Sequence, residues 1–251
     1  MLTDTHCHLA DSMLACRLPE ITNAAHATGV QRFIVPSVTE ADFDAVYRLH
    51  APPKYYGALG LHPWFAESFQ PSLISRIAER LQAQPGLLVG EIGLDFYDKT
   101  EPPARRAAQI QAFQAQLALA QQHRRPIILH NLRATAAIIQ AIQSTKFTCG
   151  GIAHAFSGSL EEARLLMQRG FKIGIGSLLL NPRAKKARIA AQQLPLDALL
   201  LETDSPFGQP ENQNTPANVL RVAQIVAELR GMALDELAGA CEQNLVGLLE
   251  R

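Results

Sequence analysis

Short apolar segments alternate with longer segments of helical character along the whole chain, and this alternation restricts the fold more than any other feature. Short apolar runs are typical of buried strands, whereas apolar residues three or four positions apart are typical of helices. We expect strands at residues 2–5, 32–35, 55–59, 87–90, 127–129, 151–153, 171–175 and 198–201. We expect helices at residues 14–28, 40–50, 71–83, 135–143, 160–169, 183–193, 216–230 and 234–250, and a long one that begins at Pro102-Pro103 and ends before Pro126.

Strands that are each followed by a helix predict a parallel sheet whose outer face is covered by helices. Eight such units in 251 residues fit a closed (β/α)8 barrel of the TIM type. We therefore expect a single α/β barrel domain over residues 1–251. The alternative is a doubly wound open sheet, but no Gly-x-Gly-x-x-Gly follows the first expected strand to support it.

The composition limits the classes of function. Lys+Arg and Asp+Glu both number 23, so no basic surplus indicates a non-specific duplex-binding protein. This balance does not exclude an enzyme that holds phosphates through bound cations. The four cysteines are scattered and suggest neither a disulfide framework nor a zinc ribbon. No targeting segment and no membrane-spanning apolar run is present, so we expect a cytoplasmic protein that does not enter the membrane.

Side chains of the kind that bind metal ions follow most of the expected strands. His6 and His8 come directly after the first strand, and residues two apart in an extended segment point to the same side. Imidazole is a ligand suited to zinc, manganese, nickel or iron. In a barrel, the carboxyl ends of the strands converge on one face. The residues expected to meet there are His6, His8, His62, Glu91, His130, His154 and Asp204. The other histidines, His26, His50 and His123, are expected on helices without a chemical role.

Six of these residues are too many ligands for one tetrahedral zinc ion, but they suit two metal ions that share a carboxylate. These six are His6, His8, Glu91, His130, His154 and Asp204. Each has an ordinary alternative when taken alone. Glu91 could cap a helix or pair with an arginine, the histidines could be satisfied core residues, and Asp204 could cap a helix before Pro206.

Six sequence blocks resemble the TatD family of metal-dependent deoxyribonucleases, in the same order and over the whole chain. They are Asp4-Thr5-His6-Cys7-His8, Gly60-Leu61-His62-Pro63, Gly90-Glu91-Ile92-Gly93-Leu94-Asp95, Ile128-Leu129-His130, His154-Ala155-Phe156-Ser157-Gly158-Ser159 and Leu201-Glu202-Thr203-Asp204-Ser205-Pro206. The resemblance implies a TIM-type barrel of the metal-dependent hydrolase superfamily. It also implies a divalent metal site and the hydrolysis of phosphodiester bonds in DNA.

The resemblance assigns roles to individual residues. It implies that His6, His8 and Asp204 bind a first metal ion and that His130 and His154 bind a second. Glu91 would bridge the two ions. Asp204 would also act as the general base toward a water activated by the two metals.

Three further residues receive less specific roles. Glu202 could be a further ligand or an acid/base group, or a structural carboxylate within its strand. His62 would contact a substrate phosphate or a metal-bound water, or support the ligands from behind. Arg133 is the expected substrate-binding cation, although the family commonly has His-Ser/Cys-Arg where this chain has His130-Asn131-Leu132-Arg133.

Other departures concern the substrate rather than the metal chemistry. Ala155 replaces a cysteine of the family pattern, and Gln213-Asn214-Thr215-Pro216 stands where Arg-Asn-x-Pro is common. Losing one fixed cation and displacing another weakens the case for a nucleic-acid backbone. Arg183, Lys185, Lys186 and Arg188 could attract phosphates or form a solvated helix face. The pair Phe96-Tyr97 could stack on a base or simply pack.

We therefore expect a metal-dependent hydrolase of ester bonds. Its activity would be that of a deoxyribonuclease, a 3′–5′ exonuclease on single-stranded DNA, with two divalent ions of magnesium, manganese or zinc. The histidines favour transition metals over magnesium. One alternative is an amidohydrolase or phosphotriesterase acting on a small ester, lactone or amide. Such enzymes often carry a carboxylated lysine where this chain has Glu91. Another alternative is a non-catalytic metal-binding interaction protein, against which the complete ligand set argues.

Overall fold

The computed structural model describes residues 1–209 and 214–250, and its eight strands form one parallel sheet in chain order. The strands are β1 (Leu2–Asp4), β2 (Val30–Pro36), β3 (Tyr55–Leu59), β4 (Leu88–Asp95), β5 (Ile127–Leu132), β6 (Gly151–Ala153), β7 (Phe171–Ile175) and β8 (Leu199–Leu201). The first and last strands meet, because Thr5 N donates to Leu201 O at 3.0 Å. The sheet therefore closes into a (β/α)8 barrel, as the alternation of segments predicted.

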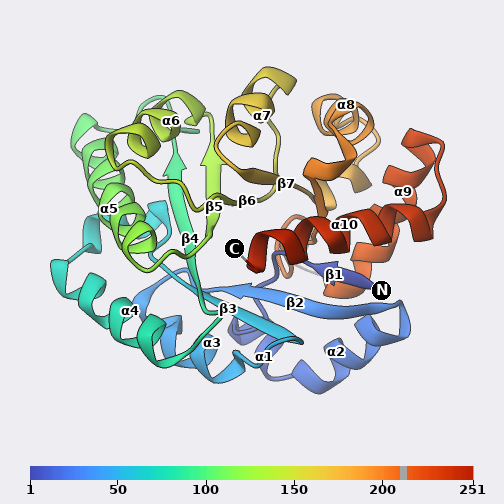
Figure 1. Cartoon of the computed structure of the whole chain (residues 1–251), viewed down its shortest axis with the longest axis horizontal. Helices are drawn as coiled ribbons and strands as arrows, with labels where there is room; N and C mark the ends of the chain where they lie inside the picture. Colours follow the sequence, from blue (N-terminus) through green and yellow to red (C-terminus); the bar gives the residue numbers. More distant parts are fainter. Residues whose placement is uncertain (210–213, 251) are drawn as a thin grey trace.

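Helices surround the barrel (Figure 1). The α-helices are α1 (Ser12–Ala15), α2 (Leu18–Ala27), α3 (Phe43–Leu49), α4 (Pro71–Ala83), α5 (Pro103–Gln122), α6 (Thr135–Ser144), α7 (Leu160–Met167), α8 (Lys185–Gln193), α9 (Val219–Arg230) and α10 (Leu234–Leu249). Short 3-10 helices include η1 (Glu40–Asp42), η2 (Pro63–Ser68), η3 (Ser177–Leu180), η4 (Leu196–Ala198) and η6 (Pro216–Asn218).

Two strands and one helix differ from the expected segments in ways that matter. β4 and β5 continue past their expected ends because they pair with each other from Ile92 and Leu129 to Asp95 and Leu132. Glu91 and His130 therefore lie within strands rather than after them. The expected helix at residues 14–28 is split into α1 and α2, since Pro19 lacks an N–H donor and fits only the first turn of a helix. The other ends differ by at most three residues.

The interior of the barrel is closed at one end by α10. Leu245 and Leu248 of this helix pack against inward-facing apolar side chains from six strands. These side chains are Ile34, Ala58, Leu88, Ile128, Ile152 and Leu200. Figure 1 shows α10 lying across the molecule beside β1. Because the helix covers the amino-terminal end, only the carboxyl-terminal end of the strands is left open for a site.

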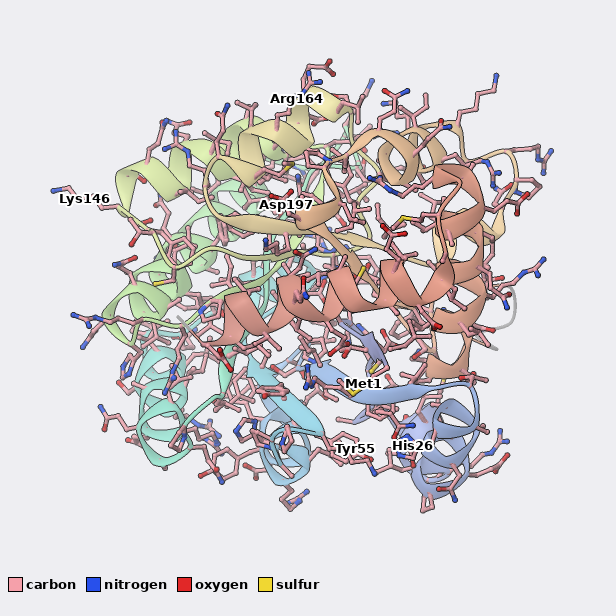
Figure 2. All side chains as sticks on the ribbon, turned by 45° about the vertical axis from the view of Figure 1, so that its right-hand side comes forward. Met1, His26, Tyr55, Lys146, Arg164 and Asp197 are labelled. Atoms are coloured by element: carbon pink, nitrogen blue, oxygen red, sulfur yellow. The ribbon has the colours of Figure 1, made fainter. Side chains whose placement is uncertain are left out.

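Charged side chains lie on the outside of the helical layer. Lys146, after α6, and Arg164, on α7, project away from the barrel (Figure 2). Within residues 1–209 and 214–250, none of the helices combines the length and the apolar character needed to cross a membrane.

Of the three histidines expected on helices, only His26 lies within one. His50 and His123 directly follow α3 and α5. His50 is buried, and its ring joins two backbone segments: Gly57 N donates to Nδ1 at 3.0 Å and Nε2 lies 3.0 Å from Pro85 O. This arrangement needs the neutral imidazole, and burial lowers the pKa of His50 below its ordinary value of 6.5.

We expect His50→Ala to lower the free energy of unfolding by about 1–3 kcal/mol at pH 8, because it leaves the buried Gly57 N–H without its partner. A lowered folded-state pKa means that the contribution of His50 is present above pH 6.5 and is lost as the pH falls through that lower pKa. The difference in the free energy of unfolding between wild type and His50→Ala should therefore become smaller toward pH 5. Denaturant unfolding at several pH values measures it, with His123→Ala as the control; a difference that widened in acid would contradict the assignment.

Candidate metal centre

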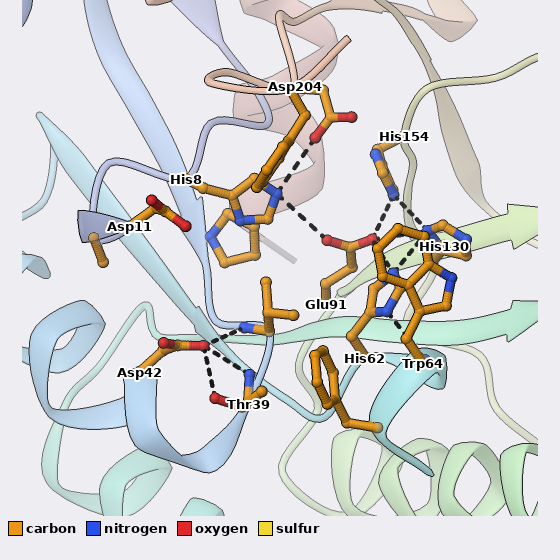
Figure 3. A pocket seen from close by; sticks show the side chains of 15 residues that line it. His8, Asp11, Thr39, Asp42, His62, Trp64, Glu91, His130, His154 and Asp204 are labelled. Carbon is orange, nitrogen blue, oxygen red and sulfur yellow. Dashed lines mark hydrogen bonds and ion pairs between the residues drawn. The ribbon is translucent and has the colours of Figure 1, made fainter. Parts of the chain in front are cut away.

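The first group of potential metal ligands forms where β1 and β8 end, and Figure 3 shows two of its members, His8 and Asp204. His6 Nε2 and His8 Nε2 are 3.1 Å apart, and Asp204 Oδ1 lies 3.5 and 3.3 Å from them. Two nitrogens bound to one zinc ion at 2.0–2.1 Å are roughly 2.9–3.4 Å apart, so this spacing suits a shared cation. The structure therefore brings together the three side chains that the family resemblance assigns to the first metal ion.

Glu91 lies between this group and a second one, with one carboxylate oxygen turned toward each. Its Oε2 is 3.2 Å from His6 Nε2 and 3.7 Å from His8 Nε2. Its Oε1 is 2.7 Å from His154 Nε2 and 2.9 Å from His130 Nδ1. A carboxylate placed in this way can bridge two cations.

His62 belongs to the second group as well, although the sequence indicated only a contact with substrate or a supporting role. Its Nε2 lies 3.2 Å from Glu91 Oε1 and 3.1 Å from His130 Nδ1. His62, Glu91 and His130 together could hold a metal ion. The ring is at this position because the 3-10 helix η2 begins with Pro63 directly after it.

Burial and charge give these groups unusual protonation. Burial lowers the pKa of His6 to about 4. For Glu91, burial raises the pKa, but the surrounding histidines outweigh it and hold the pKa well below the ordinary value. Burial lowers the pKa of His130, but Asp95 and Glu91 raise it to about 9. The donor set and its spacing fit divalent cations, which would displace the proton of His130 on binding.

A buried aspartate that the sequence analysis did not single out holds the first group in place. Asp4 Oδ1 accepts hydrogen bonds from His6 N at 3.2 Å and Thr203 N at 2.9 Å, and Oδ2 accepts one from Thr203 Oγ1 at 2.6 Å. Asp204 N donates to His6 O at 2.8 Å. These bonds keep Asp204 in the left-handed region, at φ 59°, which is uncommon for a non-glycine residue. The sequence signal that could have indicated this role is an acidic residue at the end of a buried strand.

Asp95 orients His130 from behind. Its Oδ2 lies 3.2 Å from His130 Nε2 and accepts a hydrogen bond from Trp64 Nε1 at 2.7 Å, while Oδ1 accepts one from Tyr97 N at 3.0 Å. Burial raises the pKa of Asp95, but these hydrogen bonds outweigh it and lower the pKa to about 2. A carboxylate behind a ligating histidine fixes which ring nitrogen faces the metal. The sequence does not indicate this role, because the contact of Asp95 with His130 depends on the extension of β4 and β5.

We expect Asp95→Asn to weaken metal affinity by about 10–100-fold, because a partner behind a metal ligand typically has an effect of this size. Competition with a chromogenic chelator measures it. Asp98→Asn, at an exposed position in the loop that follows β4, is the matched control. Trp64→Phe removes the other hydrogen bond to Asp95 Oδ2 and should leave metal affinity near that of wild type. If Trp64→Phe lowered metal affinity as much as Asp95→Asn, Asp95 would act by supporting local packing and not by orienting His130.

Glu202 and Arg133 lie apart from the ligand groups. Glu202 is fully buried, its carboxylate accepts a hydrogen bond from Ala155 N, and burial raises its pKa well above the ordinary value. It does not belong to any group of potential metal ligands found among residues 1–209 and 214–250. The guanidinium of Arg133 lies 4.4 Å from the centre of the Tyr97 ring, in a separate cleft. Catalytic action by Glu202 and substrate binding by Arg133 stay predictions.

The Gln213-Asn214-Thr215-Pro216 segment is described only in part. Asn214 is buried, and its Nδ2 donates to Thr203 O at 2.7 Å and to Ser177 Oγ at 2.9 Å. This asparagine therefore braces the chain beside Asp204. Gln213, which stands where the family pattern has arginine, lies outside the described residues.

A cavity of about 430 Å³ opens onto both ligand groups (Figure 3). Its apolar side chains are Ala10, Pro36, Val38, Trp64, Phe65 and Phe207. Asp11 and Asp42 also line it, and none of its described lining residues is a lysine or an arginine. Trp64 is 60% exposed, so an aromatic face is available beside the ligands. The cavity can hold a small or flat group against the metal site.

Comparisons with known proteins agree with the barrel fold. Residues 3–250 match the family model described as TatD related DNase. The uncharacterized metal-dependent hydrolase YjjV of Escherichia coli K12 is 35% identical over 96% of this chain and 95% of its own length. Its crystal structure superimposes with a TM-score of 0.91 at 33% identity and covers 100% of this chain and 98% of that chain. The 3′-5′ ssDNA/RNA exonuclease TatD of Erwinia billingiae is 26% identical over 96% of both chains. The chain therefore belongs to the TatD-related DNase family and is a metal-dependent hydrolase.

Proposed function

We propose that this hydrolase is a two-metal phosphodiesterase that removes nucleotides from the 3′ end of single-stranded DNA. The position of Glu91 supports the proposal most directly, because its two oxygens face separate groups of histidines. In this proposal His6, His8 and Asp204 hold one divalent ion, His130 and His154 hold the other, and Glu91 bridges them. Imidazole-rich sets favour manganese or zinc over magnesium.

Two bound cations would offset the charge of a phosphodiester and lower the pKa of a water between them. When this water attacks, a side chain of the protein must accept its proton. Asp204 is the residue placed to accept it. Its side chain is 27% exposed and lines the cavity, whereas that of Glu91 is 3% exposed. His6 and His8 hold Asp204 Oδ1 at 3.5 and 3.3 Å and so orient the carboxylate.

Two further observations support the removal of single nucleotides from the end of a strand. Trp64 and Phe65 are exposed at the cavity, where a base could stack on them. The printed name of the Erwinia billingiae relative assigns it 3′-5′ exonuclease action on single-stranded DNA and RNA. The preference for DNA over RNA is part of the proposal.

The test is hydrolysis of a 5′-labelled single-stranded oligonucleotide by metal-stripped protein to which manganese, zinc or magnesium is added back. We expect a ladder of products shortened from the 3′ end, which a 3′-phosphorothioate cap on the substrate suppresses. Asp204→Asn should abolish the ladder, while Asp98→Asn should not. No cleavage by folded, metal-loaded wild-type protein would refute the nuclease.

A second candidate is hydrolysis of a small ester or lactone. The apolar lining of the 430 Å³ cavity, without lysine or arginine among its described residues, favours it. A panel of aryl esters and lactones under the same metal conditions tests it. Turnover of these compounds with no turnover of DNA would replace the nuclease proposal.

A further inference from the structure

A second cleft, of about 330 Å³, lies beside the metal centre at the same end of the barrel. Tyr97 follows β4, Arg133 follows β5, Ser157 follows β6, and Lys186 is in the first turn of α8 after β7. Arg133 is three residues beyond His130, a stretch that spans at most about 11 Å. The cleft is therefore close enough to hold a neighbouring part of a substrate bound at the metals.

Arg133 is fixed in this cleft before any ligand arrives. Its backbone has φ 54°, in the left-handed region that few non-glycine residues adopt. Its Nη1 donates to Tyr97 O at 3.1 Å, and its guanidinium lies 4.4 Å from the centre of the Tyr97 ring. Tyr97 as a residue is 60% exposed. The pair combines a positioned cation with an accessible aromatic ring, as single-strand-binding sites do.

Among the described residues that line the cleft, one is acidic, and its carboxylate is already engaged. Glu162 Oε1 accepts a hydrogen bond from Thr135 Oγ1 at 2.8 Å, and Oε2 accepts one from Ser159 N at 2.8 Å. Both oxygens are therefore used at the start of α7. Lys186 adds a second cation to the same cleft, so the charge offered to a ligand there is positive.

We propose that this cleft is a second nucleotide subsite, in which Arg133 and Lys186 bind a phosphate of a single strand and the Tyr97 ring stacks on its base. The inference rests on the proposed nuclease function, which it deepens: the metal centre would hold the scissile phosphate, and the cleft would hold the strand upstream. None of the described residues that line the cavity at the metals is a lysine or an arginine, so in this proposal the cleft supplies the contacts with the backbone phosphates.

The first experiment compares a decathymidylate with bis-p-nitrophenyl phosphate, a small diester that cannot reach the cleft. We expect Lys186→Ala to raise the KM for the decamer about fivefold at 0.1 M salt. Each phosphate contact with a single strand releases roughly 0.7 counterion, and at 0.1 M salt this release strengthens binding about fivefold. Arg133→Ala combined with Lys186→Ala should raise it about 25-fold. The kcat for the small diester should be unchanged. Lys185→Ala, the adjacent lysine on α8 that does not line the cleft, is the matched control.

Tyr97 gives an independent readout. Tyr97→Phe keeps the ring and should behave as wild type, whereas Tyr97→Leu should raise the KM for the decamer about fivefold or more through lost stacking. If Tyr97→Leu, Arg133→Ala and Lys186→Ala all matched Lys185→Ala on the decamer, the subsite would be overturned.

The second experiment separates the subsite from the catalytic proposal. Fluorescence anisotropy of labelled decathymidylate with the full, metal-stripped chain measures binding without cleavage. The slope of log Kd against log salt should fall by about 0.7 for each removed cation. Binding with this dependence, but no DNA cleavage by the metal-loaded protein, would refute the nuclease and leave the subsite standing. Absence of binding by wild type would overturn the subsite.

Discussion

Replacing Glu91 by glutamine is expected to lower metal-dependent turnover by more than about 100-fold. Losing a residue that only supports a metal ligand typically lowers activity by about 10–100-fold, and the loss of a bridging ligand should exceed that range. Glu91 is the only described carboxylate that faces both ligand groups. The neutral amide keeps the size of the side chain but cannot neutralise two cations. Glu91→Gln should therefore lower metal affinity more than Asp204→Asn does, because Asp204 faces only one of the two ligand groups.

Metal binding gives a readout of the Glu91 change that does not depend on activity. Metal at 100 times its Kd should stabilise the wild type by about 2.7 kcal/mol and raise its Tm by about 5–10 °C. In Glu91→Gln this increase should be much smaller. Glu67→Gln, at an exposed position, is the control for the same chemical change. A Glu91→Gln protein with turnover within tenfold of wild type would rule out the bridging role.

Gly93→Ala is expected to destabilise the protein by more than about 4 kcal/mol, an exceptional value that requires a specific steric cause. A Cβ at Gly93 would lie 1.9 Å from His130 O and 2.9 Å from His130 N, so neighbouring backbone rather than a flexible side chain would have to move. The backbone of Gly93 also has φ +155°, which L-residues rarely adopt. Because β4 and β5 pair at this point, the substitution should also displace His130.

The matched control is Gly239→Ala on α10, where an added Cβ meets nothing within 4 Å. It should stabilise the protein by about 0.5–1 kcal/mol, since alanine loses less conformational freedom in a helix. The midpoints of denaturant unfolding compare the stabilities of the two variants. If Gly93→Ala fails to fold, the fraction of the expressed protein that is recovered in soluble form reports it. A Gly93→Ala midpoint equal to that of wild type would show that the two strands can separate at no cost.

The fold was predictable because its signals are local. Apolar segments with the period of strands and helices do not depend on distant residues, so β3, β6, β7 and α4 have the bounds expected from sequence. The gathering of His6, His8, Glu91, His130, His154 and Asp204 followed from one rule of parallel barrels, that strand ends meet on one face. No detailed geometry was needed for that prediction.

The remaining features of the site depend on register and on backbone torsion angles. Asp95 reaches His130 only because β4 and β5 pair beyond their apolar runs. The assignment of His62 to a ligand group depends on where the chain turns into η2, and the stacking of Arg133 on Tyr97 depends on a left-handed residue. Sequence alone therefore determined the barrel and the kinds of side chain that meet in it. Only the tertiary structure decided which atoms face one another, because those distances are set by contacts between segments far apart in the chain.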